Sequence, residues 1–206
     1  MKFSREGIFF GQRTGLDRLY GLTDGTYAIV LTLLALELKV PEVPGLTEAQ
    51  LVGDLAGQIT DFIAYLISFY AIAIFWMRNH WVLKPIKECD EGTFLLQFLH
   101  LFFISLTPYT SSLVGRYEED PIAPILFSGS FGLAGLSLLF LHRYLVPRKE
   151  WHDANVTEEW TKPRWMAVYP GPLFALISVP LSFMSVTLTL LLWLLLPVFS
   201  VLLQRR

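Results

Sequence analysis

The polar side chains with the clearest chemical potential lie around a hydrophobic stretch near the N-terminus. Asp24 and Glu37 are separated by only 12 uncharged residues, and Arg18 precedes both. As a helix those 12 residues would be about 18 Å long, which is too short to cross a bilayer. A membrane-spanning helix at this position must therefore bring Arg18, Asp24 or Glu37 into or near the membrane, where a charged group needs a polar partner or water.

Two interpretations of Asp24 follow from the residues alone. In the first, Asp24 pairs with Arg18, with Thr23 or with a neighbouring helix, and the contact locks helix packing. Gly21 and Gly25 would assist this packing, because two small residues four apart let another helix approach closely. In the second, the carboxylate of Asp24 binds an ion or a proton.

Farther along the same stretch, Ile29, Leu33 and Leu36 share one helical face, with Thr32 beside it. If copies of this helix surrounded an axis, rings of branched aliphatic side chains would close the central hole and gate it by dewetting. Nearly every position from 28 to 36 is apolar, so periodicity does not select this face. A stripe that faces lipid or the protein core is the alternative.

Other chemistry is not indicated. The sequence shows no Ser-His-Asp arrangement, no metal-ligand spacing and no Walker loop, so we predict neither an enzyme nor a bound cofactor or metal. Among the four histidines only His100 lies well inside an uncharged run, and the single cysteine, Cys89, cannot form an internal disulfide. The Thr-Val-Gly-Tyr-Gly filter of the usual potassium channels is missing.

The composition indicates the elements that position these residues. Hydrophobic residues make up 53% of the 206 residues and charged residues 17%, whereas a soluble domain has roughly 25% charged residues. A net charge of −2 gives no reason to expect nucleic acid as a partner. We predict an all-α polytopic membrane protein, a single domain over residues 1–206, with six spans at about 18–40, 50–83, 93–115, 121–143, 164–181 and 183–203.

Two local signals shape this count. Thr47 and Gln50 have the spacing of a capping box, so the second helix is expected to begin well before Phe62. The 38 uncharged residues 166–203 are too long for one span, and a break near 180–182 would divide them into two short ones.

Charge distribution sets the predicted orientation. With six spans, 14 of the 16 basic residues fall on one side, which leaves Lys39 and Arg116 on the other. The positive-inside rule then places both termini in the cytoplasm. The 143–164 loop contains Trp151 and Trp160 and is expected at the cytoplasmic interface, as is Trp165 just beyond it. Residues 1–15 contain no apolar core of the kind found in a signal peptide, so no cleaved leader is expected.

The first stretch resembles the transmembrane protein 175 family of potassium channels, found in bacterial membranes and in the animal lysosome. The family hallmark is an Arg, three residues and then Phe-Ser-Asp-Gly at the start of the first helix. Here Arg18 is followed by three residues and then by Leu22-Thr23-Asp24-Gly25; Ala28-Ile29, Thr32-Leu33-Leu34 and Leu36 match the rest of the pattern. Phe75-Trp76 with His80 resembles a second family feature. Leu22 and Thr23 replace Phe and Ser, which keeps an apolar surface and a hydroxyl.

The resemblance implies a homotetramer in a bacterial cell membrane, with four first helices lining a central pore for potassium and other monovalent cations, and for protons in some members. Ile29 would form the main hydrophobic constriction, with Leu33 and Leu36 as further rings. Thr32 would supply a hydroxyl layer that helps distinguish potassium from sodium. The packing network would comprise Arg18, Thr23, Asp24, Gly25, Trp76 and His80.

Two functions from other classes remain as alternatives. One is a proton- or ion-coupled secondary transporter in which Asp24 or His100 titrates, and the other is a membrane scaffold without transport. Acidic residues expected on the outer side would concentrate cations at a pore mouth or simply form a solvated loop surface; they are Glu42, Glu48, Asp54, Glu118, Glu119 and Asp120.

Overall fold

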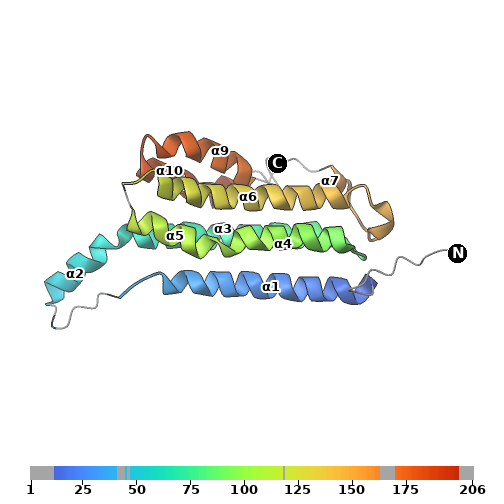
Figure 1. Ribbon diagram of the computed structural model, residues 1–206, viewed down its shortest axis with the longest axis horizontal. Coiled ribbons are helices and arrows are strands. Elements are labelled where there is room, and N and C mark those ends of the chain that lie inside the picture. Colours follow the sequence, from blue (N-terminus) through green and yellow to red (C-terminus); the bar gives the residue numbers. More distant parts are fainter. Residues whose placement is uncertain (1–11, 41–44, 46, 118, 163–169, 200–206) are drawn as a thin grey trace.

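The structure, a computed structural model, describes residues 12–40, 45, 47–117, 119–162 and 170–199. Regular structure in these residues is helical (Figure 1), apart from an isolated antiparallel bridge between Ile86 and His152. The elements are α1 (Gln12–Leu36), α2 (Glu48–Gly57), α3 (Ile59–Leu83), α4 (Glu91–Ser105), α5 (Thr107–Arg116), α6 (Ile122–Leu145), the short 3-10 helix η1 (Lys149–Trp151), α7 (Glu158–Thr161), α9 (Pro170–Ser182) and α10 (Val186–Leu194).

Four segments of this fold are long and apolar enough to cross a membrane: Leu16–Leu36, Ile59–Leu83, Glu91–Arg116 and Ile122–Leu145. Two more apolar helical segments, Gly171–Ser182 and Val186–Phe199, are shorter. The start of the predicted fifth span and the end of the predicted sixth fall at 164–169 and 200–203, outside the described residues. α9 ends at Ser182 and α10 begins at Val186, so the long apolar run turns immediately after the expected break.

The second expected helix, 50–83, is divided in the structure. Thr47 and Gln50 form the expected capping box, but α2 ends at Gly57 and α3 starts afresh at Ile59. Glycine is a poor residue for helix interiors, and Gly53 and Gly57 both lie in this short segment. No residue of α2 is buried, and α2 extends past the end of the other helices (Figure 1).

The third expected helix, 93–115, is broken as well, into α4 and α5 at Leu106. Pro108 explains the break, because proline lacks the N–H that would bond the carbonyl of Ile104 and its ring clashes with that carbonyl. Both halves run in the same direction, and together they form the candidate span Glu91–Arg116.

The helices lie side by side in the order that Figure 1 shows, with α1 along one edge and the α9–α10 pair at the other. α1 packs against α3, α4 and α5, whereas α6 packs against α4, α5 and α9. Aromatic rings fill the centre between α6 and the last two helices: the rings of Phe127, Phe131 and Trp193 stand 5.0–5.9 Å apart, centroid to centroid. The indole N–H of Trp193 donates to Ser128 at 2.9 Å. α1 therefore lies farthest from this apolar centre.

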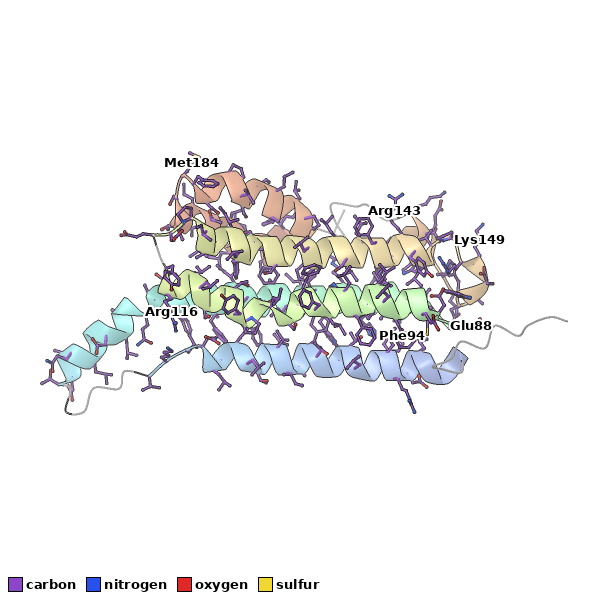
Figure 2. All side chains as sticks on the ribbon, viewed as in Figure 1. Glu88, Phe94, Arg116, Arg143, Lys149 and Met184 are labelled. Atoms are coloured by element: carbon purple, nitrogen blue, oxygen red, sulfur yellow. The ribbon has the colours of Figure 1, made fainter. Side chains whose placement is uncertain are left out.

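The two ends of the bundle differ in charge. We call the end where α1 begins the proximal end and the end where α1 stops the distal end. Figure 2 shows Arg143 and Lys149 at the proximal end, and Arg116 and Met184 at the distal end. By helix order, the described basic side chains toward the proximal end are Arg18, Arg78, Lys84, Lys87, Arg143, Arg148, Lys149 and Lys162; those toward the distal end are Lys39 and Arg116.

At the proximal end the 84–90 and 146–157 loops are bonded to each other. The backbone N–H of Lys87 donates to the carbonyl of Trp151 at 2.8 Å, and that of Asp153 donates to Pro85 at 2.7 Å. The backbone N–H of Asn155 and the Lys87 ammonium, 3.2 Å from the carboxylate, hold the pKa of Asp153 below its usual range.

The tryptophans of this loop do not share one environment. Trp160 is buried, and its indole N–H donates to the carbonyl of Val82 at 3.3 Å. The Trp160 ring is therefore packed within the protomer, because α7 turns it toward the end of α3, and the interfacial position of the loop stays a prediction. Trp151 is half-buried, and Trp165 lies outside the described residues.

Candidate functional site

The α1 helix has two distinct long faces. One face is buried against α3, α4 and α5, and it consists of residues three or four positions apart: Leu16, Leu19, Thr23, Tyr27, Val30 and Leu34. This spacing is that of a single helical stripe. The opposite face carries side chains that project away from the bundle (Figure 2). α1 is thus held along one stripe only.

The exposed face contains all four residues of the predicted constriction and hydroxyl layer. Ile29, Leu33 and Leu36 are 59%, 42% and 75% exposed, and Thr32 is exposed beside them. The hydroxyl of Thr32 donates to the carbonyl of Ile29 at 2.8 Å. Because its hydrogen is used within the helix, the oxygen of Thr32 presents lone pairs that can accept a bond or contact a cation.

The proximal part of the same face carries small and charged residues. Arg18, Gly25, Ile29 and Leu36 follow one another at intervals of seven, four and seven, so they lie in one row along the helix. A side chain built at Gly21 or Gly25 would meet nothing within 4 Å. The close-packing surface expected at these glycines is therefore open within one protomer.

Asp24 lies on the flank of α1 beside α3, where it accepts a hydrogen bond from the indole N–H of Trp76 at 2.8 Å. The rings of Trp76 and His80 are neighbours on α3, with centroids 6.1 Å apart. Asp24, Trp76 and His80 are all exposed in the protomer. The structure thus brings together three residues of the predicted packing network at an accessible seam between α1 and α3.

Thr23 lies in a second, fully buried contact. Its hydroxyl accepts from the side-chain amide of Gln97 on α4 at 2.9 Å. Gln97 and Asn79 also exchange amide bonds, with Asn79 Nδ2 donating to Gln97 Oε1 at 2.9 Å and Gln97 Nε2 donating back at 3.3 Å. One hydroxyl and two amides from α1, α3 and α4 therefore satisfy one another in the apolar interior.

A third contact lies one turn farther along α1. The hydroxyl of Tyr27 is 2.6 Å from Nε2 of His100, and both side chains are buried. The other ring nitrogen of His100, Nδ1, lies 2.9 Å from the carbonyl oxygen of Ala134 and 3.2 Å from the hydroxyl of Ser137, both on α6. His100, considered above as a titrating group, is therefore hydrogen-bonded on both sides of its ring.

Sequence reasoning did not single out Tyr27, Asn79 or Gln97. The signal for the two amides was present, since Asn79 and Gln97 are polar residues within otherwise apolar segments. Tyr27 gave no comparable signal, because a tyrosine in such a stretch is equally typical of a packed or interfacial residue.

Comparison with known proteins bears on this arrangement. The family model described as "Endosomal/lysosomal potassium channel TMEM175" matches residues 18–108, which include most of α1 and all of α3 and α4. A potassium channel of Chamaesiphon minutus is 26% identical over 189 residues, which cover 86% of this chain and 89% of that protein. A potassium channel of Streptomyces collinus is 26% identical over 181 residues, covering 84% and 85%. The endosomal/lysosomal proton channel TMEM175 of Mus musculus is 27% identical over 143 residues, only 29% of its length.

Solved structures resemble the fold as well. The crystal structure of a lysosomal potassium-selective channel TMEM175 homolog from Chamaesiphon minutus superposes with a TM-score of 0.77 at 25% identity, covering 92% of this chain and 97% of that one. A variant of the potassium channel MtTMEM175 shares the fold with a TM-score of 0.61 at 16% identity.

The helical fold and these matches define a class: this is a multi-pass membrane protein of an ion-channel family, not an enzyme. Within that class the chain is similar to the TMEM175 family, and its long matches are to bacterial members.

Proposed function

We propose that this chain is a potassium-preferring cation channel that conducts passively through a central pore lined by α1. The observation that carries the proposal is the exposed stripe of Ile29, Thr32, Leu33 and Leu36 on the side of α1 opposite its packed face. Four copies arranged around an axis would turn these stripes toward one another. The relatives named as potassium channels support potassium as the permeant ion.

Exposure of an apolar stripe would also suit a surface that faces lipid, but the polar residues of α1 favour the pore. Asp24 is exposed eight residues after Leu16, which places it about 12 Å inside the span. An exposed carboxylate at that depth is costly against acyl chains but not against water or a second subunit. Arg18 and the open glycines in the same region also favour water or a second subunit over lipid, because close helix contacts favour small residues.

In the proposed pore the apolar side chains close the path by dewetting. Ile29 forms the main constriction, and Leu33 and Leu36 form further rings toward the distal end. Thr32 places a hydroxyl oxygen next to the constriction, with its hydrogen donated to the carbonyl of Ile29. Four such oxygens would form a layer of acceptors that favours a partly dehydrated potassium ion over the more strongly hydrated sodium ion.

The remaining predicted residues hold α1 in place instead of binding the ion. Thr23 and Asp24 bond to Gln97 and Trp76 within the protomer. Arg18, Gly25 and His80 lie nearby and would complete the contacts between subunits of the homotetramer. The excess of basic residues at the proximal end supports a cytoplasmic position for that end, in a bacterial inner membrane.

Ion flux tests the proposal directly. Purified protein in potassium-loaded vesicles should discharge the potassium gradient without any coupling ion, and bilayer recordings should show channel currents. Ile29→Asn should raise conductance and weaken selectivity by wetting the constriction. The matched control is Leu176→Asn, because Leu176 is 73% exposed but lies on α9, on the far side of the bundle from α1.

Three results would overturn the proposal. Unchanged currents from a correctly assembled Ile29→Asn channel would contradict the pore assignment. Flux that requires an opposing proton or sodium gradient would establish a carrier, with Asp24 or His100 as the group to test next. Silence in both assays would favour a scaffold.

A further inference from the structure

We propose that Tyr27 and His100 form a strut that sets the rotation of α1 about its own axis, and that this strut is a determinant of ion selectivity. The inference rests on the proposed pore, because rotation of α1 matters only if α1 lines it. Tyr27 and His100 contact no ion in this proposal. They act as positioning residues, through the direction in which Ile29 and Thr32 point.

The hydrogen atoms of the strut are fixed by its partners. The carbonyl of Ala134 can only accept, so Nδ1 of His100, 2.9 Å away, carries the ring hydrogen and donates. In a neutral ring Nε2 then has a lone pair, and it accepts the hydrogen bond of the Tyr27 hydroxyl at 2.6 Å. The chain of bonds runs from Tyr27 on α1 through His100 on α4 to the backbone of α6.

The backbone at its far end makes the strut a firm reference point. α6 is packed so closely against α9 that a methyl group on Gly132 would lie 2.6 Å from the side chain of Ala175. Interiors packed to this degree are not easily deformed. The ring of Phe75 on α3 also lies beside His100, with centroids 6.1 Å apart. The position of the His100 ring is thus determined by two helices in addition to its own.

Tyr27 is also the last polar anchor before the proposed constriction. Thr23, Asp24 and Tyr27 each make a hydrogen bond from α1 to another helix, and Tyr27 is the one nearest to Ile29. Beyond Tyr27 the buried face continues with Val30 and Leu34, which are held by apolar contacts. Apolar contacts are non-directional, so they fix the rotation of a helix less strictly than a hydrogen bond does.

Because α1 is a rigid helix, loss of the bond between Tyr27 and His100 would also change the orientation of the residues that line the proposed pore. Ile29 is two residues after Tyr27, so it points about 200° away around the helix. A small rotation at Tyr27 therefore turns Ile29 and Thr32 by the same angle on the opposite face. Such a rotation changes both the width of the constriction and the direction of the hydroxyl layer.

Selectivity measured on assembled channels tests the strut. Tyr27→Phe removes the hydroxyl and keeps the ring, and Tyr20→Phe is the matched control, since Tyr20 is a half-buried tyrosine on the same helix. We expect Tyr27→Phe to change the potassium-to-sodium permeability ratio by about twofold to tenfold, the factor that corresponds to the net free energy of one hydrogen bond. Tyr20→Phe should leave the ratio unchanged. Assembled Tyr27→Phe channels with the wild-type ratio would overturn the proposal.

Variants at His100 provide an independent reading if Tyr27→Phe assembles poorly. His100→Leu removes the acceptor and should change the potassium-to-sodium permeability ratio. In His100→Gln the amide oxygen can still accept from Tyr27, so the ratio should stay close to that of the native channel. The double variant Tyr27→Phe/His100→Leu should match His100→Leu alone, because the bond between Tyr27 and His100 is already lost in that variant. Additive effects on the permeability ratio would contradict a strut, as would equal effects of His100→Leu and His100→Gln.

Thiol modification separates failure of the strut from failure of the pore. In a Cys89→Ser background, a water-soluble thiol reagent should block Ile29→Cys channels, and addition of Tyr27→Phe should weaken that block and increase the block at Ala28→Cys or Val30→Cys. An unchanged pattern in Tyr27→Phe overturns the strut alone. No block of Ile29→Cys with the native Tyr27 overturns the proposed pore, and the strut with it.

Discussion

Gly21 and Gly25 of α1 have surroundings opposite to those of Gly132 and Gly135 of α6. A methyl group on Gly132 or Gly135 of α6 would lie 2.6 Å from Ala175 or 2.5 Å from Pro172, so both positions are filled by α9 within the protomer. On α1, Gly21 and Gly25 have nothing within 4 Å of such a methyl group. Glycine thus allows a close helix–helix contact between α6 and α9, whereas on α1 it lies at a surface that no other helix of the protomer contacts. Gly21 and Gly25 therefore contact no other helix of their own protomer.

The balance of apolar contacts and hydrogen bonds also differs between the two sides. Aromatic rings of Phe131, Phe174 and Trp193 lie between α6, α9 and α10, where contact depends on shape. α1 is joined to its neighbours by hydrogen bonds of Thr23, Asp24 and Tyr27. Hydrogen bonds are directional, so a few of them can fix the orientation of a helix that makes few close apolar contacts.

Filling the closed glycine contact should produce the largest effect. Gly135→Ala forces a methyl group against the Pro172 ring, so α6 and α9 must move apart; overpacking of this kind costs about 1–3 kcal/mol. The measurement is the thermal unfolding midpoint of the purified protein in detergent. Gly129→Ala is the matched control, because Gly129 lies on the same helix with nothing within 4 Å. An equal midpoint for the two variants would show that the α6–α9 contact is not tight.

Breaking the buried amide contact of α1 should have the next largest effect. Gln97→Leu leaves Asn79 without its amide partner and Thr23 without its donor, and an unsatisfied buried polar group costs about 1–3 kcal/mol in water-soluble proteins and somewhat less between membrane helices. The loss is again measured as a lower unfolding midpoint in detergent.

The control for this loss is a second substitution. Asn79→Leu together with Gln97→Leu removes both amides, and replacing both partners by apolar groups is often close to neutral. The double variant should therefore be less destabilised than the sum of the two single variants. Strict additivity would mean that the two amides do not depend on each other.

The sequence predicts that most of these helices exist, but it does not predict where they end or which helices they contact. Charge spacing indicates α1, and the uncharged runs indicate α3, α4 with α5, and α6, because long apolar segments need only composition to be recognised. The break after Gly57 depends on weak helix propensity over a few residues, and such boundaries are decided by tertiary contacts. Pro108, in contrast, marks its break in the sequence itself.

The candidate site, too, is only partly predictable from the sequence. The family pattern identifies Ile29, Thr32, Leu33 and Leu36, but periodicity does not choose their face, because almost all their neighbours are apolar too. In the structure these four residues lie on the exposed face of α1, whereas Tyr27 on the packed face bonds to His100, 73 residues away in sequence. A bond of that kind leaves no local pattern, since neither residue needs a particular neighbour to form it.

The two sides of the bundle are tied at the proximal end by Asp90, which should matter less than either interior contact. Asp90 caps α4 by accepting from the backbone N–H of Thr93 at 2.9 Å, and its other oxygen accepts from the Tyr144 hydroxyl of α6 at 2.6 Å. Burial alone would raise the pKa of Asp90, but the bonds from Tyr144 and Thr93 outweigh it and lower that pKa. Asp90→Ala should cost about 0.5–2 kcal/mol at neutral pH through loss of the cap.

The sign of the pH effect follows from the lowered pKa. The unfolded chain takes up the proton at a higher pH than the folded one, so Asp90 contributes stability above the ordinary carboxyl range and loses it as pH falls below about 4. Asp90→Asn keeps the cap but removes this titration. Its unfolding midpoint should therefore fall less between pH 6 and pH 3 than that of the native protein. Glu91→Gln, at the next position, is the control, and a native-like acid response of Asp90→Asn would contradict the assignment.

The smallest effect on stability is expected at the exposed seam between α1 and α3. Trp76→Phe removes the indole N–H that donates to Asp24 at 2.8 Å and keeps an aromatic ring beside His80. Because the bond is exposed within the protomer, its loss should lower protomer stability by less than about 1 kcal/mol.

If a neighbouring subunit covers Asp24, however, the same substitution leaves a buried carboxylate without its donor, and the oligomer weakens more than the protomer does. Light scattering of the detergent-solubilised particle against protein concentration separates the two. Dissociation of Trp76→Phe at concentrations where Met77→Leu, at the adjacent exposed position, stays assembled would place the seam at a subunit contact. Equal assembly of both variants would place it at the lipid or solvent boundary.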